Sequence, residues 1–203
     1  MTPADLLRLP RPLILASRSP RRAELLRLLG IPFRVYPAQL DEPSGSTTQP
    51  PTEYVLSLAR AKALTVARLC AEPCLIIGAD TTVVADDTCW GKPATAEDAR
   101  TLLERLSGRT HDVYTGVVLL RVPEMELSGG VARTEVTFRP LRSTEIDAYI
   151  ATGSPLDKAG GYGIQDPFGA IFVESVRGCY YNVVGLPLSL VYELLRQACD
   201  AEQ

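Results

Sequence analysis

The sequence alternates short, continuously apolar runs with segments whose apolar residues recur at helical spacing, and this alternation restricts the fold to the α/β class. The first unit shows the pattern clearly. Leu13–Ala16 is apolar throughout, as in a strand buried on both faces, and a helix is predicted directly after it. Ser19 is expected to cap this helix, Pro20 suits its first position, and Gly30 ends it.

The same alternation continues along the chain. Thr52 is expected to cap the second helix, and residues 41–51 are expected to form a turn-rich loop with acidic residues at its start. Several predicted strands follow one another without an intervening helix, which favours a mixed sheet over a purely parallel one. The predicted strands cover residues 13–16, 33–36, 75–85, 113–120, 134–138 and 170–174. The predicted helices cover residues 20–29, 52–69, 97–106, 143–152 and 187–198.

Charge and apolar patterning exclude several classes of protein. A net charge of −3 over 203 residues argues against a dedicated nucleic-acid binder, which needs a basic face. The chain contains no run of about 18 apolar residues, so no membrane-spanning segment is expected. Residues 1–12 carry an early acid and prolines, and we expect a short lead-in there rather than a secretion signal. These features predict a cytoplasmic location.

Cysteine and histidine usage narrows the chemistry further. The five cysteines are scattered and form no C-x-x-C pair, so we interpret them as reduced, mostly buried thiols. A single histidine excludes multi-histidine metal sites and leaves one candidate for a Ser-His-Asp triad. That residue, His111, falls between a predicted helix end and a predicted strand start, which favours a structural role.

The segment SRSPRR at residues 17–22 is the first candidate binding site. A strand delivers the chain to a helix N-terminus, where unpaired N–H groups and the helix dipole attract an anion. The hydroxyls and arginines of the segment would add hydrogen-bond donors to a phosphate. The alternative is an ordinary helix cap with solvated arginines. A Walker loop is excluded, because the sequence lacks G-x-x-x-x-G-K-[ST].

Asp80 is the second candidate, because it ends the apolar run LIIGA. A buried carboxylate is costly unless it has partners or binds a metal, although Asp80 could instead sit where the strand meets water. Two carboxylates with a divalent cation can hold a triphosphate and activate water. The acids that could face Asp80 are Glu42, Glu53, Asp86, Asp87 and Asp157.

Lysine is scarce, since only Lys62, Lys92 and Lys158 are lysines among 21 basic residues. A GC-rich genome explains the scarcity, yet the three positions lie in suggestive contexts. Lys62 falls on an apolar helical stripe, where snorkelling to solvent is the alternative explanation. Lys92 lies in a Gly-Lys-Pro turn, and Lys158 precedes Ala-Gly-Gly. A compact ammonium group suits contacts to phosphate oxygens.

The glycine-rich segment 157–165 is the last candidate. Its glycines permit close approach of the backbone to a ligand, and Gln165 could read a base edge with both a donor and an acceptor. The alternative is a turn-rich connection between a helix and a strand.

Together these motifs closely resemble the Maf family of nucleoside triphosphate pyrophosphatases. The resemblance covers nearly the whole chain after residue 12, in family order. The matching segments are LILASRSPRRAELL (13–26), Asp41-Glu42, YVLSLARAKA (54–63), IGADTTV (77–83), GKP (91–93), LSGRTHDVYTGV (106–117), LDKAGGYGIQ (156–165) and NVVGLPL (182–188).

The resemblance implies a mixed sheet flanked by helices, with two lobes around a deep nucleotide groove. Residues 13–198 would form a single domain, after the lead-in 1–12 and before a tail at 199–203. It also implies hydrolysis between the α and β phosphates with a divalent cation (Mg²⁺ or Mn²⁺), and it is compatible with a homodimer. Asp80 matches the proton acceptor, and Glu42 matches a polar position that lines the groove. By their own chemistry Asp80 and Glu42 would hold the cation, and the sequence does not divide the roles of metal ligand and proton acceptor. The matching phosphate-binding and groove-lining positions are Ser17, Arg22, Lys62, Lys92 and Lys158, and those linked to substrate choice are Arg21, Thr81 and Gln165.

Within the family, the pattern around Asp80-Thr81 resembles the branch that acts on dTTP and UTP. The branch that acts on 7-methyl-GTP typically reads Ser-Asp-Gln at that strand, and this chain does not. One departure is an extra residue in the segment 165–169, which we expect to reshape the groove rim without touching the named positions. A nucleotide sensor that controls cell division, with incidental turnover, and a phosphatase that releases single phosphates remain alternative functions.

Overall fold

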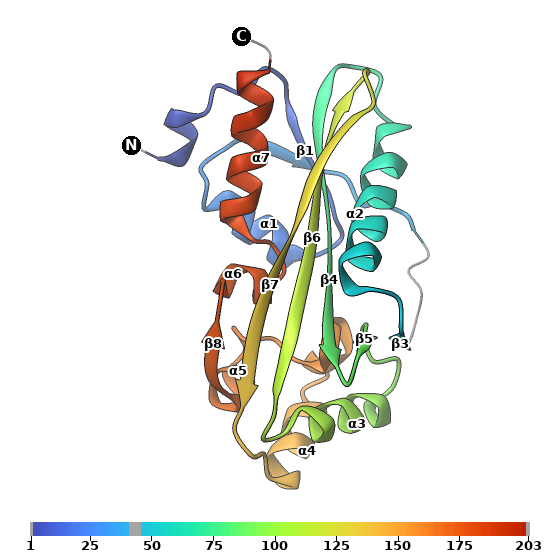
Figure 1. Ribbon diagram of the computed structural model, residues 1–203, viewed down its shortest axis with the longest axis vertical. Helices are drawn as coiled ribbons and strands as arrows, with labels where there is room; N and C mark the ends of the chain where they lie inside the picture. Colours follow the sequence, from blue (N-terminus) through green and yellow to red (C-terminus); the bar gives the residue numbers. More distant parts are fainter. Residues whose placement is uncertain (1, 41–45, 202–203) are drawn as a thin grey trace.

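A single mixed β-sheet organises the molecule in the computed structural model, which describes residues 2–40 and 46–201. The strand order is β2-β1-β4-β6-β7-β8, and the small strands β5 and β3 extend the sheet beside β4 (Figure 1). β1 pairs in parallel with β2 and β4, whereas β4, β6, β7 and β8 pair in antiparallel fashion. The mixed α/β fold is therefore confirmed. The strands are β1 (Leu13–Ala16), β2 (Phe33–Val35), β3 (Ser46–Thr47), β4 (Cys74–Ala85), β5 (Thr88–Trp90), β6 (Thr110–Val122), β7 (Glu126–Phe138) and β8 (Val173–Arg177).

Helices cover both faces of this sheet in its upper half and enclose its lower end (Figure 1). α1 and α7 lie on one face and α2 lies on the other, while α3, α4 and α5 surround the lower ends of the long strands. The α-helices are α1 (Pro20–Arg27), α2 (Pro51–Ala67), α3 (Ala96–Leu106), α4 (Ser143–Ala151), α5 (Pro167–Phe172), α6 (Tyr180–Val184) and α7 (Leu188–Asp200). Short 3-10 turns are η1 (Pro3–Leu6), η2 (Ser154–Asp157) and η3 (Ala159–Gly161).

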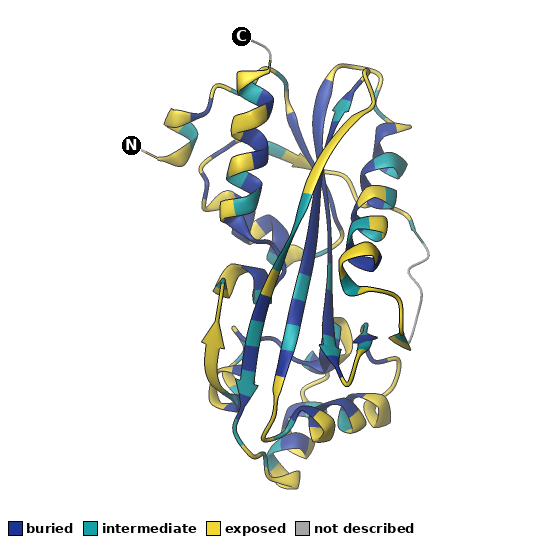
Figure 2. Cartoon of the chain, in the orientation of Figure 1, coloured by how far each residue is buried: buried dark blue, intermediate teal, exposed yellow. Residues whose placement is uncertain are grey.

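The apolar run of β1 is explained by the two layers of helix. Leu13 and Leu15 point into the core with α1 and α7, whereas Ile14 and Ala16 point into the core with α2. Successive side chains of a strand alternate between faces, so a strand covered on both sides must be apolar at every position. Figure 2 shows the result, since the central strands are buried for most of their length.

Two glycines bring α2 unusually close to the sheet. A Cβ atom on Gly78 of β4 would lie 2.1 Å from the carbonyl oxygen of Ala59 in α2. A Cβ atom on Gly116 of β6 would lie 2.8 Å from the carbonyl oxygen of Val55. Only glycine allows the backbones to approach this closely. The side chains of α2 that face the sheet are therefore pressed against β4 and β6.

The prediction that Thr52 caps the second helix is wrong. The helix begins at Pro51 with Pro50 in the capping position, so Thr52 lies inside its first turn and does not cap it. Proline is well suited to this start, because its fixed φ matches the helix and its missing N–H has no partner there anyway. Part of the loop predicted at 41–51 is also wrong, because Ser46–Thr47 pairs with β5 as a short strand. Residues 41–45 of that loop lie outside the described residues.

The strand predicted at 170–174 is wrong in its first three residues. Helix α5 occupies Pro167–Phe172, and strand β8 begins only at Val173. Phe168 and Phe172 are four residues apart, so one helical turn places both rings against Tyr149. An apolar run this short fits a buried strand or a buried helical turn equally well. The periodicity alone therefore could not separate the two.

The structure bears on two broader expectations. Within residues 2–40 and 46–201, no helix is both long and apolar enough to cross a bilayer. Cys74 and Cys89 are buried, whereas the other three cysteines are half-buried, so burial of the thiols is less complete than expected.

Candidate active site

A cavity of about 560 Å³ opens between the start of α1, the middle of α2, strand β4 and the turns η2 and η3. It brings together all nine predicted site residues that the structure describes. The tenth, Glu42, lies outside the described residues. The nine residues that line the cavity are Ser17, Arg21, Arg22, Lys62, Asp80, Thr81, Lys92, Lys158 and Gln165.

The turn between β1 and α1 forms one end of this cavity. Ser17 is buried, and its Oγ atom accepts a hydrogen bond from the backbone N–H of Ser19 at 3.0 Å. Ser19 holds the capping position as predicted, although no hydrogen bond to its side chain is present at this helix start in the described structure. The turn thus presents the N-terminus of α1, with Pro20 in its first position, to the cavity.

Arg22 is fixed by a chain of hydrogen bonds that reaches the core. Its Nε donates to the carbonyl of Gly185 at 2.8 Å, and its Nη2 donates to Oγ1 of Thr81 at 3.0 Å. Oγ1 of Thr81 also lies 3.0 Å from Oγ1 of Thr115, whose hydroxyl donates to the carbonyl of Asn182. The chain therefore holds the guanidinium in one orientation at the cavity wall.

Asp80 and Lys62 form a buried ion pair at the centre of the cavity. Nζ of Lys62 lies 2.6 Å from Oδ1 of Asp80, and the two side chains are only 6% and 10% exposed. Asp80 lies within the continuous strand β4, so the alternative that it sits where a strand meets water is wrong. The snorkelling alternative for Lys62 is also wrong, because its side chain ends inside the protein.

Two of the carboxylates that could have faced Asp80 are paired with basic side chains instead. Asp86 is paired with Arg105 and Arg109 at the surface. Asp157 lies at the cavity rim, where it pairs with Arg21 and Lys158. Within residues 2–40 and 46–201, no group of three histidine, cysteine or acidic side chains could hold a metal ion. A cation here would therefore need oxygen ligands from outside this set.

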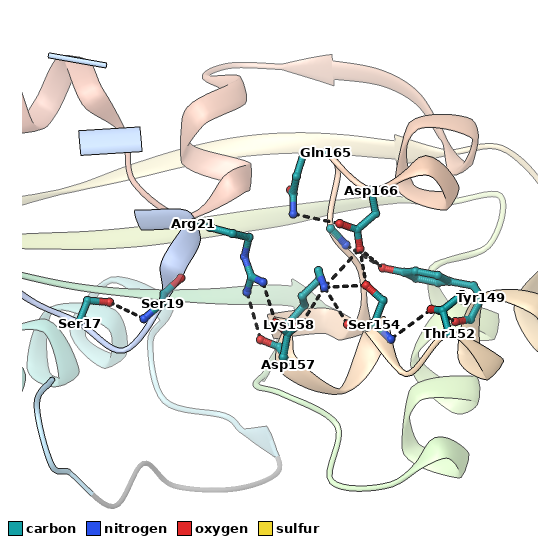
Figure 3. Close-up of polar contacts among 11 residues, drawn as sticks. Ser17, Ser19, Arg21, Tyr149, Thr152, Ser154, Asp157, Lys158, Gln165 and Asp166 are labelled. Carbon is teal, nitrogen blue, oxygen red and sulfur yellow. Dashed lines mark hydrogen bonds and ion pairs between the residues drawn. The ribbon is translucent and has the colours of Figure 1, made fainter. Parts of the chain in front are cut away.

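Lys158 is held by several hydrogen bonds from its ammonium group (Figure 3). Its Nζ atom donates to the carbonyl and to the hydroxyl of Ser154, each at 2.8 Å, and to Oδ1 of Asp157 at 2.6 Å. Arg21 reaches the same Asp157 from α1, with Nη1 2.8 Å from Oδ2. Burial raises the pKa of Asp157, but hydrogen bonds from Lys158 and Arg21 outweigh burial and keep that pKa below its usual range.

Asp166, the residue that follows Gln165, was not among the predicted site residues. Its carboxylate lies 3.3 Å from Nζ of Lys158 and accepts a hydrogen bond from Nε2 of Gln165 at 3.2 Å. The expectation that segment 165–169 leaves the named positions untouched is therefore wrong. Its place beside Gln165 was the one available signal, because its contacts with Ser154 and Lys158 depend on how the chain folds between residues 154 and 166.

His111 has the structural role predicted for it. The ring is buried, and Nε2 lies 2.8 Å from the hydroxyl of Tyr162. It also packs edge-on against Phe138. Burial lowers the pKa of His111 to about 4, so the ring is neutral at pH 7.

An apolar wall of the cavity was also missed by the sequence reasoning. It is built from side chains of α2 and of the segment that follows β2, which by sequence are ordinary helix and loop positions. Apolar side chains of this kind suit contact with a ring more than with a phosphate. Its members include Ala38, Leu40, Tyr54 and Leu58.

Comparison with known proteins agrees with this picture. A family model described as Maf-like protein matches residues 12–198. The dTTP/UTP pyrophosphatase of Moorella thermoacetica is 51% identical over 183 residues, which cover 90% of this chain and 93% of that protein. The dTTP/UTP pyrophosphatase of Bacillus cytotoxicus is 48% identical over 184 residues, which cover 91% of this chain and 94% of the other.

Among solved structures, a HAM1 protein from Coxiella burnetii aligns with a TM-score of 0.52 and 18% identity. The alignment covers 92% of this chain and 99% of that one, and at this identity it supports the fold alone. The family model and the curated relatives span nearly the whole chain, which confirms the resemblance seen in the sequence motifs. The chain belongs to the Maf family.

Proposed function

We propose that this protein hydrolyses nucleoside triphosphates between the α and β phosphates, giving a monophosphate and pyrophosphate, and that dTTP and UTP are its substrates. The observation that carries the proposal is the buried Lys62–Asp80 pair in a cavity rimmed by further cations. A carboxylate set among phosphate-binding groups is the arrangement that hydrolysis requires and that simple binding does not. The names of the curated relatives support the choice of nucleotide.

The triphosphate would lie against the α1 end of the cavity. There the Ser17 turn and the N-terminus of α1 offer hydrogen-bond donors, and Arg22 is already oriented by Gly185 and Thr81. Lys92 and Lys158 would approach the phosphates from the other side of the cavity. Fixed cations of this kind stabilise the charge that gathers on departing pyrophosphate, and they do so without rearranging.

Asp80 would act as the proton acceptor. Its carboxylate is held by Lys62, so its position relative to a bound phosphate is fixed before substrate arrives. The carboxylate would take the proton of the attacking water, and the Lys62 ammonium would balance the charge of the carboxylate and of the nearest phosphate oxygen. The buried setting strengthens both interactions compared with their values in water.

A divalent cation, Mg²⁺ or Mn²⁺, fits the donor chemistry of the site. Carboxylate and phosphate oxygens are the ligands such ions prefer, and Asp80 supplies one carboxylate at the cavity. Glu42 would supply the second carboxylate, and the substrate phosphates would complete the set. Bound there, the cation would neutralise phosphate charge and make the phosphorus more open to attack.

The base would occupy the apolar side of the cavity, within reach of Gln165. A pyrimidine presents both hydrogen-bond donors and acceptors on one edge, and a glutamine amide can match each of them. Arg21 would contact the substrate from the rim. Thr81 would influence substrate choice through Arg22, whose guanidinium it holds.

We also propose that residues 13–198 form one domain with two lobes. The long strands β4, β6 and β7 support this, because they carry helices of both halves of the molecule (Figure 1).

A nucleotide panel tests the proposal. Purified protein is incubated with UTP, dTTP, CTP, ATP, GTP and 7-methyl-GTP in Mg²⁺ or Mn²⁺, and pyrophosphate and orthophosphate are measured separately. We expect pyrophosphate with UTP and dTTP, and loss of turnover when EDTA removes the cation.

Each other outcome would assign a different function to the protein. Orthophosphate without pyrophosphate would identify a phosphatase. Tight binding of nucleotide without turnover would identify a sensor. Preference for 7-methyl-GTP would place the chain in the other branch of the family.

A further inference from the structure

The carboxylate of Asp166 connects two parts of the proposed site through its two oxygen atoms (Figure 3). Oδ2 accepts hydrogen bonds from the hydroxyls of Tyr149 at 2.9 Å and Ser154 at 2.8 Å, and lies 3.3 Å from Nζ of Lys158. Oδ1 accepts the hydrogen bond from Nε2 of Gln165 at 3.2 Å. One oxygen thus belongs to the lysine cluster and the other belongs to the glutamine.

Asp166 acts from behind the cavity wall. Lys158 and Gln165 line the cavity, whereas Asp166 is not among the described residues that do so. Gly163 allows this crowding, because a Cβ atom there would lie 2.7 Å from Nε2 of Gln165 and 2.7 Å from Cε of Lys158. The two side chains therefore cross the same glycine, and Asp166 holds their polar ends.

The chemistry of a carboxylate decides which way the glutamine amide faces. An ionised carboxylate only accepts hydrogen bonds, so Gln165 must turn its NH₂ group toward Asp166. The carbonyl Oε1 is then the atom of the amide that Asp166 does not engage, and because Gln165 lines the cavity, Oε1 is the group that it can offer to a ligand there. An amide without this neighbour could flip and present its NH₂ group instead.

We infer that Asp166 is a positioning residue that fixes the amide of Gln165 so that the cavity offers a carbonyl to the base. In this arrangement the carbonyl faces N3 of the base, where uracil and thymine carry an N–H donor, which a carbonyl accepts, and cytosine carries an acceptor, which a carbonyl repels. A carbonyl that faced the 4-amino group of cytosine would not discriminate in this way, so the selectivity requires the contact at N3. Asp166 thereby makes the site select uracil and thymine over cytosine. The inference rests on the proposed function, because it concerns the base of the same substrate.

The test compares UTP with CTP in wild-type protein, Asp166→Asn and Asp166→Ala. In Asp166→Asn the new amide can donate or accept, so both orientations of Gln165 become allowed. We expect the ratio of kcat/KM for UTP to kcat/KM for CTP to fall about tenfold, the value of one mismatched hydrogen bond. Asp166→Asn is nearly isosteric, so it keeps the test open where Asp166→Ala fails to fold.

Ser154→Ala is the matched control. It removes a donor to Oδ2 and a partner of Lys158, but it leaves the contact between Oδ1 and Gln165 in place. We expect kcat to fall for both nucleotides while the UTP-to-CTP ratio is kept. A merely structural role for Asp166 predicts the same pattern for Asp166→Asn, and that result would overturn the inference.

A binding measurement separates this inference from the proposed function. Dissociation constants are measured by calorimetry for UTP and CTP analogues with a methylene group between the α and β phosphorus atoms. If wild-type protein releases no pyrophosphate from any nucleotide, the proposed function fails, and the binding ratio still decides the role of Asp166. Equal binding and turnover of the two bases in wild-type protein would overturn the inference directly.

Discussion

Nζ of Lys62, in helix α2, lies 2.6 Å from Oδ1 of Asp80, in strand β4, and almost no solvent reaches either side chain. Each side chain neutralises the charge of the other, because an isolated ion buried in this position would strongly destabilise the folded protein. The pair also lies on the cavity surface, so a bound phosphate meets a carboxylate and an ammonium already held together. Stability and chemistry are therefore linked at this one contact.

Replacing Asp80 with Asn removes both the proton acceptor and the partner of Lys62. Turnover is expected to fall about 10³-fold, because an amide cannot take a proton from water. The free energy of unfolding is expected to fall by about 3 kcal/mol, because the Lys62 charge remains buried without its counter-ion. Pyrophosphate release and urea unfolding measure the two effects, and activity close to wild type would contradict the assignment.

A double variant separates the two effects. Lys62→Met combined with Asp80→Asn removes the uncompensated charge and keeps a side chain of similar length. We expect most of the lost stability to return while turnover stays at least as low as in the single variant. Recovery of turnover together with stability would mean that the single variant failed for structural reasons alone.

Gly78→Ala is expected to separate α2 from β4. The added Cβ would meet the carbonyl oxygen of Ala59 at 2.1 Å, so the helix must move away and carry Lys62 with it. A loss of about 3 kcal/mol in unfolding free energy, together with a clear fall in kcat, is expected from overpacking at this contact. Gly108→Ala serves as the control, because its nearest neighbour would be Pro140 at an ordinary 3.6 Å. Its positive φ of 67° predicts a cost of about 1 kcal/mol without a change in kcat.

Arg21→Ala is expected to change substrate binding more than stability. The ion pair of Arg21 with Asp157 is partly open to solvent, with the Asp157 side chain 63% exposed, so its loss should cost less than about 1 kcal/mol. Loss of a cation at the cavity rim should raise KM for UTP about tenfold. Asp157→Asn is the companion variant, since it keeps the cation and should not raise KM through this contact. An equal rise of KM in both variants would show that the ion pair itself matters for binding.

Stability should depend on pH through His111. Burial lowers the pKa of this ring from 6.5 to about 4 in the folded protein. Between these values the unfolded chain binds a proton that the folded protein does not, so stability is fully present above pH 6.5 and is lost as pH falls toward 4. Urea unfolding should give about 2 kcal/mol less stability at pH 5 than at pH 7.5 from this group.

His111→Gln checks the origin of that change. The variant cannot titrate at this position, so its unfolding free energy should vary less between pH 7.5 and pH 5 than that of wild-type protein. The same pH dependence in both proteins would assign the effect to other groups.

Local patterns predicted the parts of the fold that depend on one segment alone. β1 and the start of α1 follow directly from an apolar run, a serine and a proline, and the structure places both as predicted. The nine described candidates come from different helices, strands and turns, and the fold brings them to one cavity. The prediction that these residues lie together came from the resemblance to the family, because spacing along the chain does not show which turns meet in space.

Contacts between elements could not be predicted in the same way. Lys62 was expected on an apolar stripe, but its partner depends on how closely α2 packs over Gly78. Asp166 was missed because its role depends on a contact in space. The fold brings the ammonium group of Lys158 to 3.3 Å from the carboxylate of Asp166, and no pattern in the sequence predicts that contact. Part of helix α5 was predicted as a strand because its apolar run is too short to show a helical period. Only the packing of Phe168 and Phe172 on Tyr149 shows that the two rings lie on one face of a helical turn.

The ladder between β4 and β6 is continuous from Cys74 opposite Val122 to Val84 opposite Asp112. Motion of two halves about a hinge needs a connecting segment with few contacts, and here the connection is the hydrogen-bonded centre of the sheet. The protein should therefore unfold in one cooperative, all-or-none step, with neither half able to survive the loss of the other. Asp80, opposite Gly116 in that ladder, is then as rigid as the sheet itself, and any substrate must adapt to it.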